Sequence, residues 1–463
     1  MTPVVIDRRV AFRSGGRVAM GGAPWKVVRF ADAALPFLGE LRRAGEAGVV
    51  PVSPVERAVA RRLLDQGLAH PGPAPRPGPH PVTVVVPAYG RADRLRRCLA
   101  SLGGLPVIVV DDASPDPGPV RAAAEAHGAR LVRHRVNRGP AAARNTGLRL
   151  AGTPFVAFVD SDCRVEPGWL DALMPCLDDP GTAAAAPRVV PAPGGPRILA
   201  RYERTRSALD MGGAPALVRP GARLSFVPSA TLLVRRETVA ALGFDEALRL
   251  GEDVDLVWRL SDAGHHVRFR PAARVAHDPR PTWREWAVRR HEYGTSAAEL
   301  AARHPGRLAP VRPSPWNLAA LALLVSGRPA AAAATAAVSA ALLARGMGHL
   351  PGHRALSATI VAQGVAADPA ALGHALRREW WPLGLVCLAA APRRRAARAA
   401  AAAMLLPIAA EWLRAPSLDP VRYTAVRLAD DLAYGTGVWA SALRHRTAAP
   451  LLPLLRRPKA RRT

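Results

Sequence analysis

The chain has 463 residues, which is enough for two or three domains with substantial hydrophobic cores. Its 64 Lys and Arg outnumber 36 Asp and Glu, and the formal net charge of +28 points to an acidic partner: nucleic acid, anionic lipid or a phosphorylated substrate. Nucleic acid is disfavoured, because the excess is almost entirely Arg within a general Ala, Gly and Pro bias, and no nucleic-acid-binding module accompanies it.

The four cysteines, at positions 98, 163, 176 and 387, form no CxxC pair and show no metal-ligand spacing. That usage fits a reducing compartment. The first residues, MTPVVIDRRVAFRSGG, contain no apolar segment of signal-peptide length. We therefore expect residues 1–300 to lie in the cytosol.

Residues 1–70 are predicted to form a small separate module. Short β-runs with SGG and GG turns precede two helical patterns, the second of which places Val55, Val59, Leu63 and Leu64 on one face. A β-ribbon beside a helix pair suggests a winged-helix-type domain, either a structural appendage or a platform that binds a peptide. Residues 71–81, within HPGPAPRPGPHP, are too rich in proline for a helix and predict an extended linker.

Residues 82–300 alternate apolar β-runs with helical patterns. VTVVVP, VIVVDD, ARLVRH and FVAFVD are each separated from the next by a helical stretch, and further β-runs follow near 182–190, 223–235 and 266–276. Continuous apolar strands of this kind are buried on both faces of a parallel sheet. The fold class is therefore α/β, with a Rossmann-like, mostly parallel sheet as the catalytic domain.

Residues 301–463 are rich in Ala and Leu and predict an α-helical region. The most apolar runs cover 316–327, 329–344, 380–391 and 399–410, each shorter than the roughly 18–20 residues that a spanning helix requires. A self-packed bundle and short hairpins entering a membrane both remain open. Flanking aromatic and basic residues (Trp380, Trp381, Trp412, Arg393–Arg395 and Arg461-Arg462) favour association with an anionic membrane surface.

Two β-runs end in residues suited to a nucleotide. Ligands of open parallel sheets bind beyond the carboxyl ends of the strands, which places Pro87 and Tyr89 in the same crevice as Asp111 and Asp112. Aspartates there can accept hydrogen bonds from a ribose or from the imide N–H of uracil. The alternative is that they cap the helix that follows.

The run FVAFVDSDC ends in two carboxylates, Asp160 and Asp162, one residue apart. One divalent cation can bridge such a pair and a diphosphate, and oxygen ligands suit Mg²⁺ or Mn²⁺. A solvated turn is the alternative interpretation. His277, which follows another β-run in VAHDPR, is a candidate third ligand because of this context alone.

Two helix starts complete the candidate site. NRGPAAARNTG places Arg144 one turn into a helix, where it suits phosphate charge, and GEDVDLVWRLSD places Glu252 and Asp253 in a first helical turn. A carboxylate there can take the proton of an acceptor hydroxyl. Trp258 is either a core residue or a wall of the acceptor site.

The order PAYGR, VVDDAS, N-x-G-x-A-x-A-R-N, D-S-D and G-E-D-x-D over residues 82–280 resembles glycosyltransferase family 2, which has the GT-A fold. The resemblance implies an inverting, metal-dependent enzyme. On that resemblance Pro87, Tyr89, Asp111 and Asp112 hold the nucleoside, Asp160 and Asp162 the metal-bound diphosphate, and Asp253 is the catalytic base. The residue patterns themselves add Arg144 to the nucleotide-sugar site and His277 to the metal site, and they place Glu252 and Trp258 beside the acceptor. Gly90 replaces the Asn usual after PAY, and the Q-x-x-R-W motif of processive synthases is absent.

The whole chain is similar to a narrower family as well. GGAPWKVVRF and ARRLLDQGLAHP resemble PqqD-like peptide-binding modules, and LDPVRYTAVRLADDLAYGTGVWASALRHRT resembles the mycofactocin-system glycosyltransferases of actinobacteria. That resemblance implies transfer of β-1,4-linked glucose from UDP-glucose to premycofactocin at the cytoplasmic side of the membrane. A family-2 enzyme acting on a polyprenyl phosphate or cell-envelope glycan, and a non-catalytic peptide-binding scaffold, stay open as alternatives.

Overall fold

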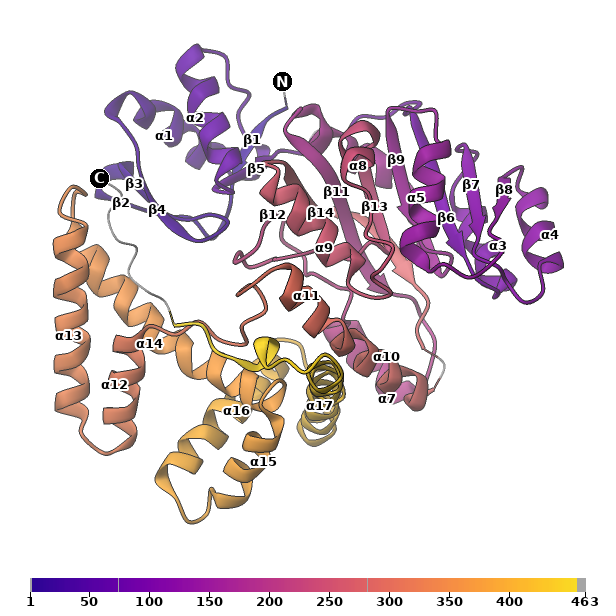
Figure 1. The fold of residues 1–463 in the computed structure, drawn as a ribbon. Coiled ribbons are helices and arrows are strands. Elements are labelled where there is room, and N and C mark those ends of the chain that lie inside the picture. The colour runs from indigo at the N-terminus through magenta and orange to yellow at the C-terminus, as the bar shows by residue number, and fades with distance from the viewer. Residues whose placement is uncertain (1, 74, 281, 456–463) are drawn as a thin grey trace. The chain divides into compact units, whose positions relative to one another are not determined.

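The computed structural model describes residues 2–73, 75–280 and 282–455 (Figure 1). The predicted Arg461-Arg462 flank lies outside these residues. The chain forms two compact units, one comprising Met1–Gly195 with Arg206–Pro279 and the other Pro196–Thr205 with Arg280–Thr463. The segment 280–300, which the sequence analysis joins to the sheet domain, thus packs with the second unit.

The N-terminal part of the first unit is a small α/β module. Its elements are β1 (Val4–Ile6), β2 (Ala11–Arg13), β3 (Val18–Gly21), β4 (Lys26–Arg29), α1 (Leu35–Ala44), α2 (Pro54–Asp65) and β5 (Ala69–Pro71). Strands β2, β3 and β4 form an antiparallel sheet, and β1 pairs with β5. A capping box between Ser53 and Glu56 starts α2, which buries Val59 and Leu63 as predicted but leaves Val55 49% exposed.

A nine-stranded sheet forms the rest of the first unit. Its strands are β6 (Val82–Ala88), β7 (Val107–Asp111), β8 (Arg130–Arg133), β9 (Phe155–Val159), β10 (Cys163–Val165), β11 (Thr182–Pro191), β12 (Ala216–Val218), β13 (Thr231–Arg235) and β14 (His266–His277). They are ordered β10-β14-β11-β13-β9-β6-β7-β8, and β12 pairs with β14. The run β9-β6-β7-β8 is parallel, whereas β13 joins β9 antiparallel.

Helices between the strands cover the sheet. They are α3 (Ala92–Ser101), α4 (Gly118–Ala126), α5 (Pro140–Leu150), α6 (Trp169–Leu173), α8 (Arg236–Leu242) and α9 (Glu252–Asp262). Strands β6 and β9 are almost wholly buried, which explains their unbroken apolar sequences. Helix α5 approaches β6 closely at Gly147, where an added β-carbon would stand 2.2 Å from a methyl group of Val85.

Ion pairs fasten the N-terminal module to the sheet. Arg61 on α2 lies 2.8 Å from Asp179, and Arg76 in the proline-rich segment lies 2.8 Å from Asp178. Arg270 on β14 donates to the carbonyl oxygens of Pro71 and Gly72. The described residues of 71–81 are non-helical, and contacts at Pro71, Gly72, Arg76 and His80 attach them to the sheet domain.

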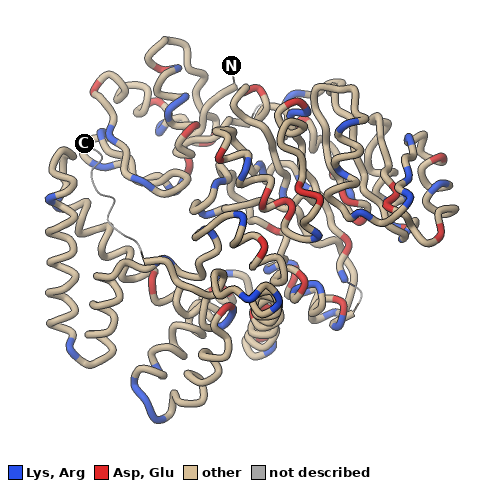
Figure 2. The backbone as a smooth tube through the Cα atoms, in the orientation of Figure 1, with Lys and Arg blue, Asp and Glu red and all other residues tan. Residues whose placement is uncertain are grey.

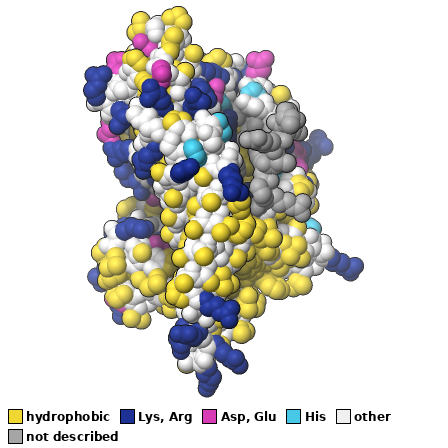
Figure 3. All heavy atoms as spheres, turned by 90° about the vertical axis from the view of Figure 1, so that its left-hand side faces the viewer, with side chains coloured by type: hydrophobic (Ala, Val, Ile, Leu, Met, Phe, Trp, Pro, Cys, Tyr) yellow, Lys and Arg dark blue, Asp and Glu magenta, His cyan; other side chains and the backbone are white. Residues whose placement is uncertain are grey.

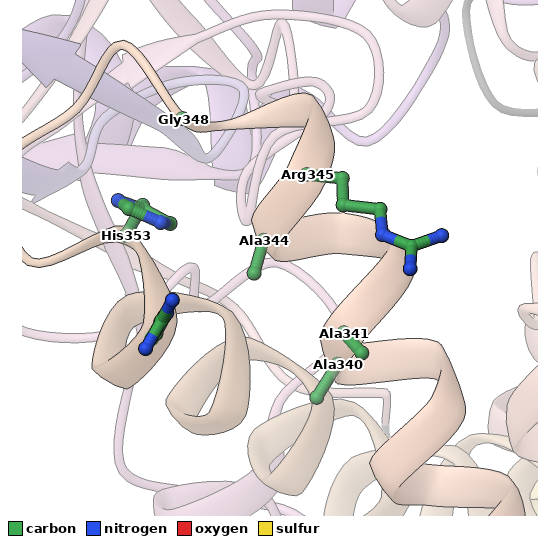
Figure 4. A pocket seen from close by; sticks show the side chains of 7 residues that line it. Ala340, Ala341, Ala344, Arg345, Gly348 and His353 are labelled. Atoms are coloured by element: carbon green, nitrogen blue, oxygen red, sulfur yellow. The ribbon is translucent and has the colours of Figure 1, made fainter.

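The regular secondary structure of the second unit, among the residues that the structure describes, is helical. It contains α7 (Arg197–Arg206), α10 (Trp283–Thr295), α11 (Ala297–Arg303), α12 (Pro315–Val325), α13 (Pro329–Gly346), α14 (His353–Arg377), α15 (Trp381–Ala390), α16 (Arg395–Arg414) and α17 (Pro420–Arg444). Helices α12 and α13 form one hairpin, and α15 and α16 form another (Figure 1). A hollow of about 460 Å³ lies at the turn between α13 and α14, lined by alanines of α13 with Arg345, His353 and Arg354 at its rim (Figure 4).

The helices of this unit are longer than the apolar runs in the sequence suggest. By length and composition, α13, α14 and α16 could each cross a membrane, with mean hydropathy of 1.2, 1.3 and 1.3. The expectation that every apolar helix falls short of spanning length is therefore wrong. Helices α14 and α16 continue through Pro369 and Pro407, so an internal proline does not end either helix, whereas Arg328 and Pro329 do separate α12 from α13.

Two of the tryptophans predicted to mark a membrane interface make hydrogen bonds within the second unit. The indole N–H of Trp380 donates to the Leu451 carbonyl at 2.7 Å, and that of Trp412 donates to the Leu418 carbonyl at 2.8 Å. Both side chains are partly buried. Their indoles thus tie helix ends to neighbouring loops of the same unit.

Candidate functional site

The predicted nucleotide-binding residues lie together at the carboxyl ends of two adjacent strands. Ala88 at the end of β6 pairs with Asp111 at the end of β7, and the Asp112 amide donates to the Ala88 carbonyl at 2.8 Å. Tyr89 follows directly, with 54% of its surface exposed. An exposed phenol ring beside a strand end is available for a planar ligand.

Asp111 and Asp112 are buried and bonded within the chain. The Asp111 carboxylate accepts from the amide of Ser114 at 3.0 Å and from the Arg133 guanidinium. The Asp112 carboxylate accepts from the Gly139 amide at 2.7 Å and lies 2.7 Å from His134 Nδ1. These bonds fix the loops around the strand ends, whereas direct contact with a nucleotide stays a prediction.

Arg144 joins the end of β9 to the start of α9. Its Nη2 donates to Asp160 Oδ1 at 2.6 Å, and its Nη1 donates to Glu252 Oε1 at 2.8 Å. Arg144 is 3% exposed and its guanidinium stacks on Phe244, 5.5 Å from the ring centroid. Burial alone would lower the Arg144 pKa, but the Asp160 and Glu252 carboxylates raise it, so the side chain stays cationic.

The predicted metal ligands come from two strands that pair antiparallel. Asp160 and Asp162 precede β10, in which Cys163 is the register partner of His277 on β14. As a result His277 Nε2 lies 3.4 Å from Asp162 Oδ2. The Asp160 amide donates to the Ala230 carbonyl at 2.8 Å, which holds the turn against β13.

These donors fit a divalent cation in part. Two carboxylates and one imidazole at a strand edge form a donor set that Mg²⁺ or Mn²⁺ accepts, and Asp162 and His277 already face each other. Asp160 is turned toward Arg144, and across residues 2–73, 75–280 and 282–455 no group of three or more His, Cys, Asp or Glu side chains is arranged as a ligand cluster.

Asp253 is oriented by backbone amides. Its Oδ2 accepts from the Ser229 amide at 3.2 Å and its Oδ1 from the Val254 amide at 2.8 Å. Burial and the negative charge of Asp160 raise the pKa of the Asp253 carboxyl, against the opposing effect of these hydrogen bonds. A raised pKa brings a carboxylate closer to the basicity that proton abstraction needs.

Two predicted acceptor contacts, Trp258 and Glu252, are buried in the structure. Trp258 is 2% exposed and its indole N–H donates to the Ser225 carbonyl at 2.8 Å, so of the two interpretations the core residue is the correct one. Glu252 is 7% exposed and forms an ion pair with Arg144. Burial, and then the charge of Asp253, raise the pKa of Glu252.

Arg94 and Asp278 belong to the site but were not predicted. Arg94 Nη1 lies 3.6 Å from Asp162 Oδ2, and the Asp278 amide donates to the Asp162 carbonyl at 2.9 Å. The Asp278 carboxylate pairs with Arg97 at 2.7 Å. A sequence signal did exist, because Asp278 directly follows His277 and both arginines lie on α3, the helix that follows β6.

Comparison with known proteins agrees with this geometry. The profile of glycosyl transferase family 2 matches residues 83–240, which hold every strand from β6 to β13. A pre-mycofactocin glycosyltransferase from Mycobacterium tuberculosis is 39% identical over 468 aligned positions, covering 98% of this chain and 97% of the relative. A succinoglycan biosynthesis protein, ExoO, from Rhizobium meliloti is 31% identical over 214 positions, covering 42% of this chain and 59% of the relative.

Among solved structures, a mannosyltransferase from Pyrobaculum calidifontis in complex with GDP-Man and Mn²⁺ is 26% identical. The match covers 65% of this chain and 89% of that one, with a TM-score of 0.38. The identity over nearly the full length of the mycobacterial relative settles the family. The chain belongs to glycosyltransferase family 2, in the family of the Mycobacterium tuberculosis pre-mycofactocin glycosyltransferase.

Proposed function

We propose that the protein is a metal-dependent, inverting hexosyltransferase that moves glucose from UDP-glucose to premycofactocin and extends a β-1,4-linked glucan chain. Support for the acceptor comes from the 39% identity to a pre-mycofactocin glycosyltransferase over 98% of the chain. Support for the chemistry comes from one arrangement: Arg144 links Asp160 to Glu252, beside the amide-anchored Asp253.

The proposed reaction is a single displacement. Asp253 takes the proton of the attacking acceptor hydroxyl while that oxygen bonds to the anomeric carbon from the face opposite the leaving group. The bond between the anomeric carbon and the diphosphate oxygen breaks, and the electron pair leaves with UDP. Inversion at the anomeric carbon follows from one such displacement.

The remaining residues orient these groups and manage charge. The Ser229 and Val254 amides fix the Asp253 carboxylate, and Arg144 supplies the buried positive charge that lets three carboxylates approach one another. A divalent cation, Mg²⁺ or Mn²⁺, held by Asp160, Asp162 and His277, would supply the charge that stabilises the departing diphosphate. Tyr89 offers an exposed ring for the nucleoside.

A second candidate is a family-2 enzyme that glycosylates a polyprenyl phosphate or a cell-envelope glycan. The observation that favours it is the group of three helices long and apolar enough to cross a membrane. A non-catalytic peptide-binding scaffold is the candidate of another class, and the clustered carboxylates argue against it.

The purified protein can separate these candidates. It is incubated with UDP-glucose and either Mg²⁺ or Mn²⁺. One reaction contains premycofactocin and another contains a polyprenyl phosphate. The masses of the products are then measured by mass spectrometry. Hexose increments on premycofactocin alone support the proposal, and increments on the polyprenyl phosphate alone support the second candidate. If neither hexose transfer nor UDP release is detected with any acceptor, the non-catalytic scaffold is the remaining candidate.

A further inference from the structure

Five exposed arginines gather where two helical hairpins turn. Arg328 lies in the turn between α12 and α13; the others lie at the turn between α15 and α16, at positions 393, 394, 395 and 398. The two turns adjoin, since a β-carbon on Gly327 would stand 3.0 Å from Arg395 Nη1. Figure 2 shows basic positions at both turns and no acidic ones. We name these five residues the arginine tip.

The arginine tip is unpaired and borders apolar surface. Within the described part of the chain none of its five guanidinium groups forms an ion pair, and the turn sequences SGRP and APRRRAAR contain no acid. Next to it, Leu324 on α12 is 53% exposed and Val386 on α15 is 63% exposed. Figure 3 shows apolar side chains over this part of the second unit, with Lys and Arg side chains at its end. Cations beside exposed apolar groups match the boundary between phosphate head groups and acyl chains.

The shorter helix of each hairpin, α12 or α15, is too short to span a membrane. Helix α12 has 11 residues and α15 has 10, so each is about 15–17 Å long, half of the roughly 30 Å hydrocarbon core. The chain before α12 is non-helical and contains Arg312. If α13 crossed the bilayer, this irregular backbone and its guanidinium would lie at membrane depth, where unsatisfied polar groups are costly.

Helix α16 has charges beside its midpoint as well. Arg377 donates to the carbonyl of Met404, halfway along α16, and lies 2.9 Å from the Asp431 carboxylate. Asp431 also pairs with Arg427 at 2.6 Å. A spanning α16 would carry this ionic cluster into the middle of the hydrocarbon. These apolar helices therefore fit a position at the membrane surface better than one across the bilayer.

We infer that the arginine tip and the apolar flanks of the α12–α13 and α15–α16 hairpins bind the surface of an anionic phospholipid bilayer, and that the second unit is held there peripherally. The guanidinium groups contact head-group phosphates, and Leu324 and Val386 lie against the acyl boundary. This inference is independent of the donor and acceptor proposed above. It requires only that the chain fold.

The test is flotation of the full-length protein with lipid vesicles. One set is phosphatidylcholine alone, and the other is phosphatidylcholine mixed with phosphatidylglycerol. The protein should float only with the mixed vesicles, and less so as salt rises. The variant R393Q/R394Q/R395Q should bind about a hundredfold more weakly, because each basic residue near an anionic surface contributes about 1 kcal/mol.

The matched control is R284Q/R444Q/R446Q, which removes the same charge from exposed arginines at the start of α10 and at and just after the end of α17. It should bind as the unmodified protein does. Equal loss in the control, or equal binding to phosphatidylcholine alone, would overturn the inference. Retention in a membrane pellet through high salt and alkaline carbonate would show a spanning unit instead. Binding of duplex DNA by the tip, with none to vesicles, would assign the arginines to nucleic acid.

Discussion

His277 Nε2 lies 3.4 Å from Asp162 Oδ2, although the two residues belong to segments far apart in the sequence. Antiparallel pairing of β10 with β14 creates this contact, and the Asp278 amide strengthens it by donating to the Asp162 carbonyl. The edge of the sheet thus presents an imidazole and a carboxylate on neighbouring strands. Both are donors for a divalent cation.

Replacing Asp162 by Ala should weaken metal-dependent binding of the donor by at least about tenfold, because a charged ligand to the cation is lost. Calorimetric titration of UDP-glucose with and without Mn²⁺ measures the effect. Asp116→Ala, an exposed aspartate on the loop after β7, is the matched control and should bind normally. Removal of metal by EDTA should abolish turnover and restored Mg²⁺ or Mn²⁺ should recover it. Unchanged metal dependence in Asp162→Ala would exclude this residue as a ligand.

Asp253→Asn should lower kcat by about 10²- to 10⁴-fold, the range that a positioned general base contributes. The amide side chain is isosteric and can still accept from the Ser229 amide, so donor affinity should change little. Steady-state kinetics with UDP-glucose and acceptor give the rate, and calorimetry gives the affinity. Wild-type turnover in this variant would remove Asp253 from the role of base.

The acid side of the activity profile should reflect the raised pKa of Asp253. Burial and the Asp160 charge raise it, so the carboxyl is protonated over a wider pH range than an ordinary aspartic acid. A protonated carboxyl cannot accept the hydroxyl proton, so kcat/KM should fall with decreasing pH and reach half its maximum above the usual value of about 4. Circular dichroism at each pH controls for unfolding. A flat profile down to that value would contradict the assignment.

Arg144→Met should destabilise the fold by about 3–5 kcal/mol, because it leaves the Asp160 and Glu252 carboxylates without their buried partner. The control is Arg138→Met, which removes a half-exposed ion pair with Glu246 and should cost less than about 1 kcal/mol. Urea unfolding measures both. Equal losses for the two variants would show that the Arg144 bridge contributes no more than a surface pair.

Asp179→Asn should loosen the N-terminal module from the sheet. Burial alone would raise the Asp179 pKa. The hydrogen bonds with His266 and the Gly181 amide, and the charges of two arginines, outweigh this effect, so the Asp179 pKa is lowered. A lowered carboxyl pKa contributes stability above its unfolded value and loses it as pH falls toward the folded value. The variant should therefore lose about 2–3 kcal/mol at neutral pH and less in acid. Asp116→Asn, an exposed aspartate on the loop after β7, is the control in urea unfolding.

The sequence predicted the strands and their carboxyl ends well, because buried parallel strands leave unbroken apolar runs. β6, β7 and β9 lie where the runs VTVVVP, VIVVDD and FVAFVD occur. The ordered motifs after those runs placed the acidic residues at one edge. This much depends on local pattern and on a simple rule of sheet topology.

The remaining features depend on tertiary pairing. Asp278 and Arg94 reach Asp162 only because β10 pairs with β14 and α3 packs nearby. Helix α14 was missed as a long apolar helix because Asp368 and Pro369 interrupt its sequence, yet Asn317 on α12 bonds the Asp368 carboxylate at 2.8 Å. Composition alone cannot show that such a partner exists.

The proline-rich segment has a kinetic consequence. Arg76 and His80 are fastened to Asp178 and Asp171, at 2.8 and 2.7 Å, so the stretch behaves as a strut. A ligand bound to the N-terminal module would then be held at a fixed position relative to the sheet domain. It would not have to diffuse on a flexible linker before it reached the site. Inserting residues into this proline-rich segment should therefore change the rate at which such a ligand reaches the site far more than the same insertion into a flexible linker would.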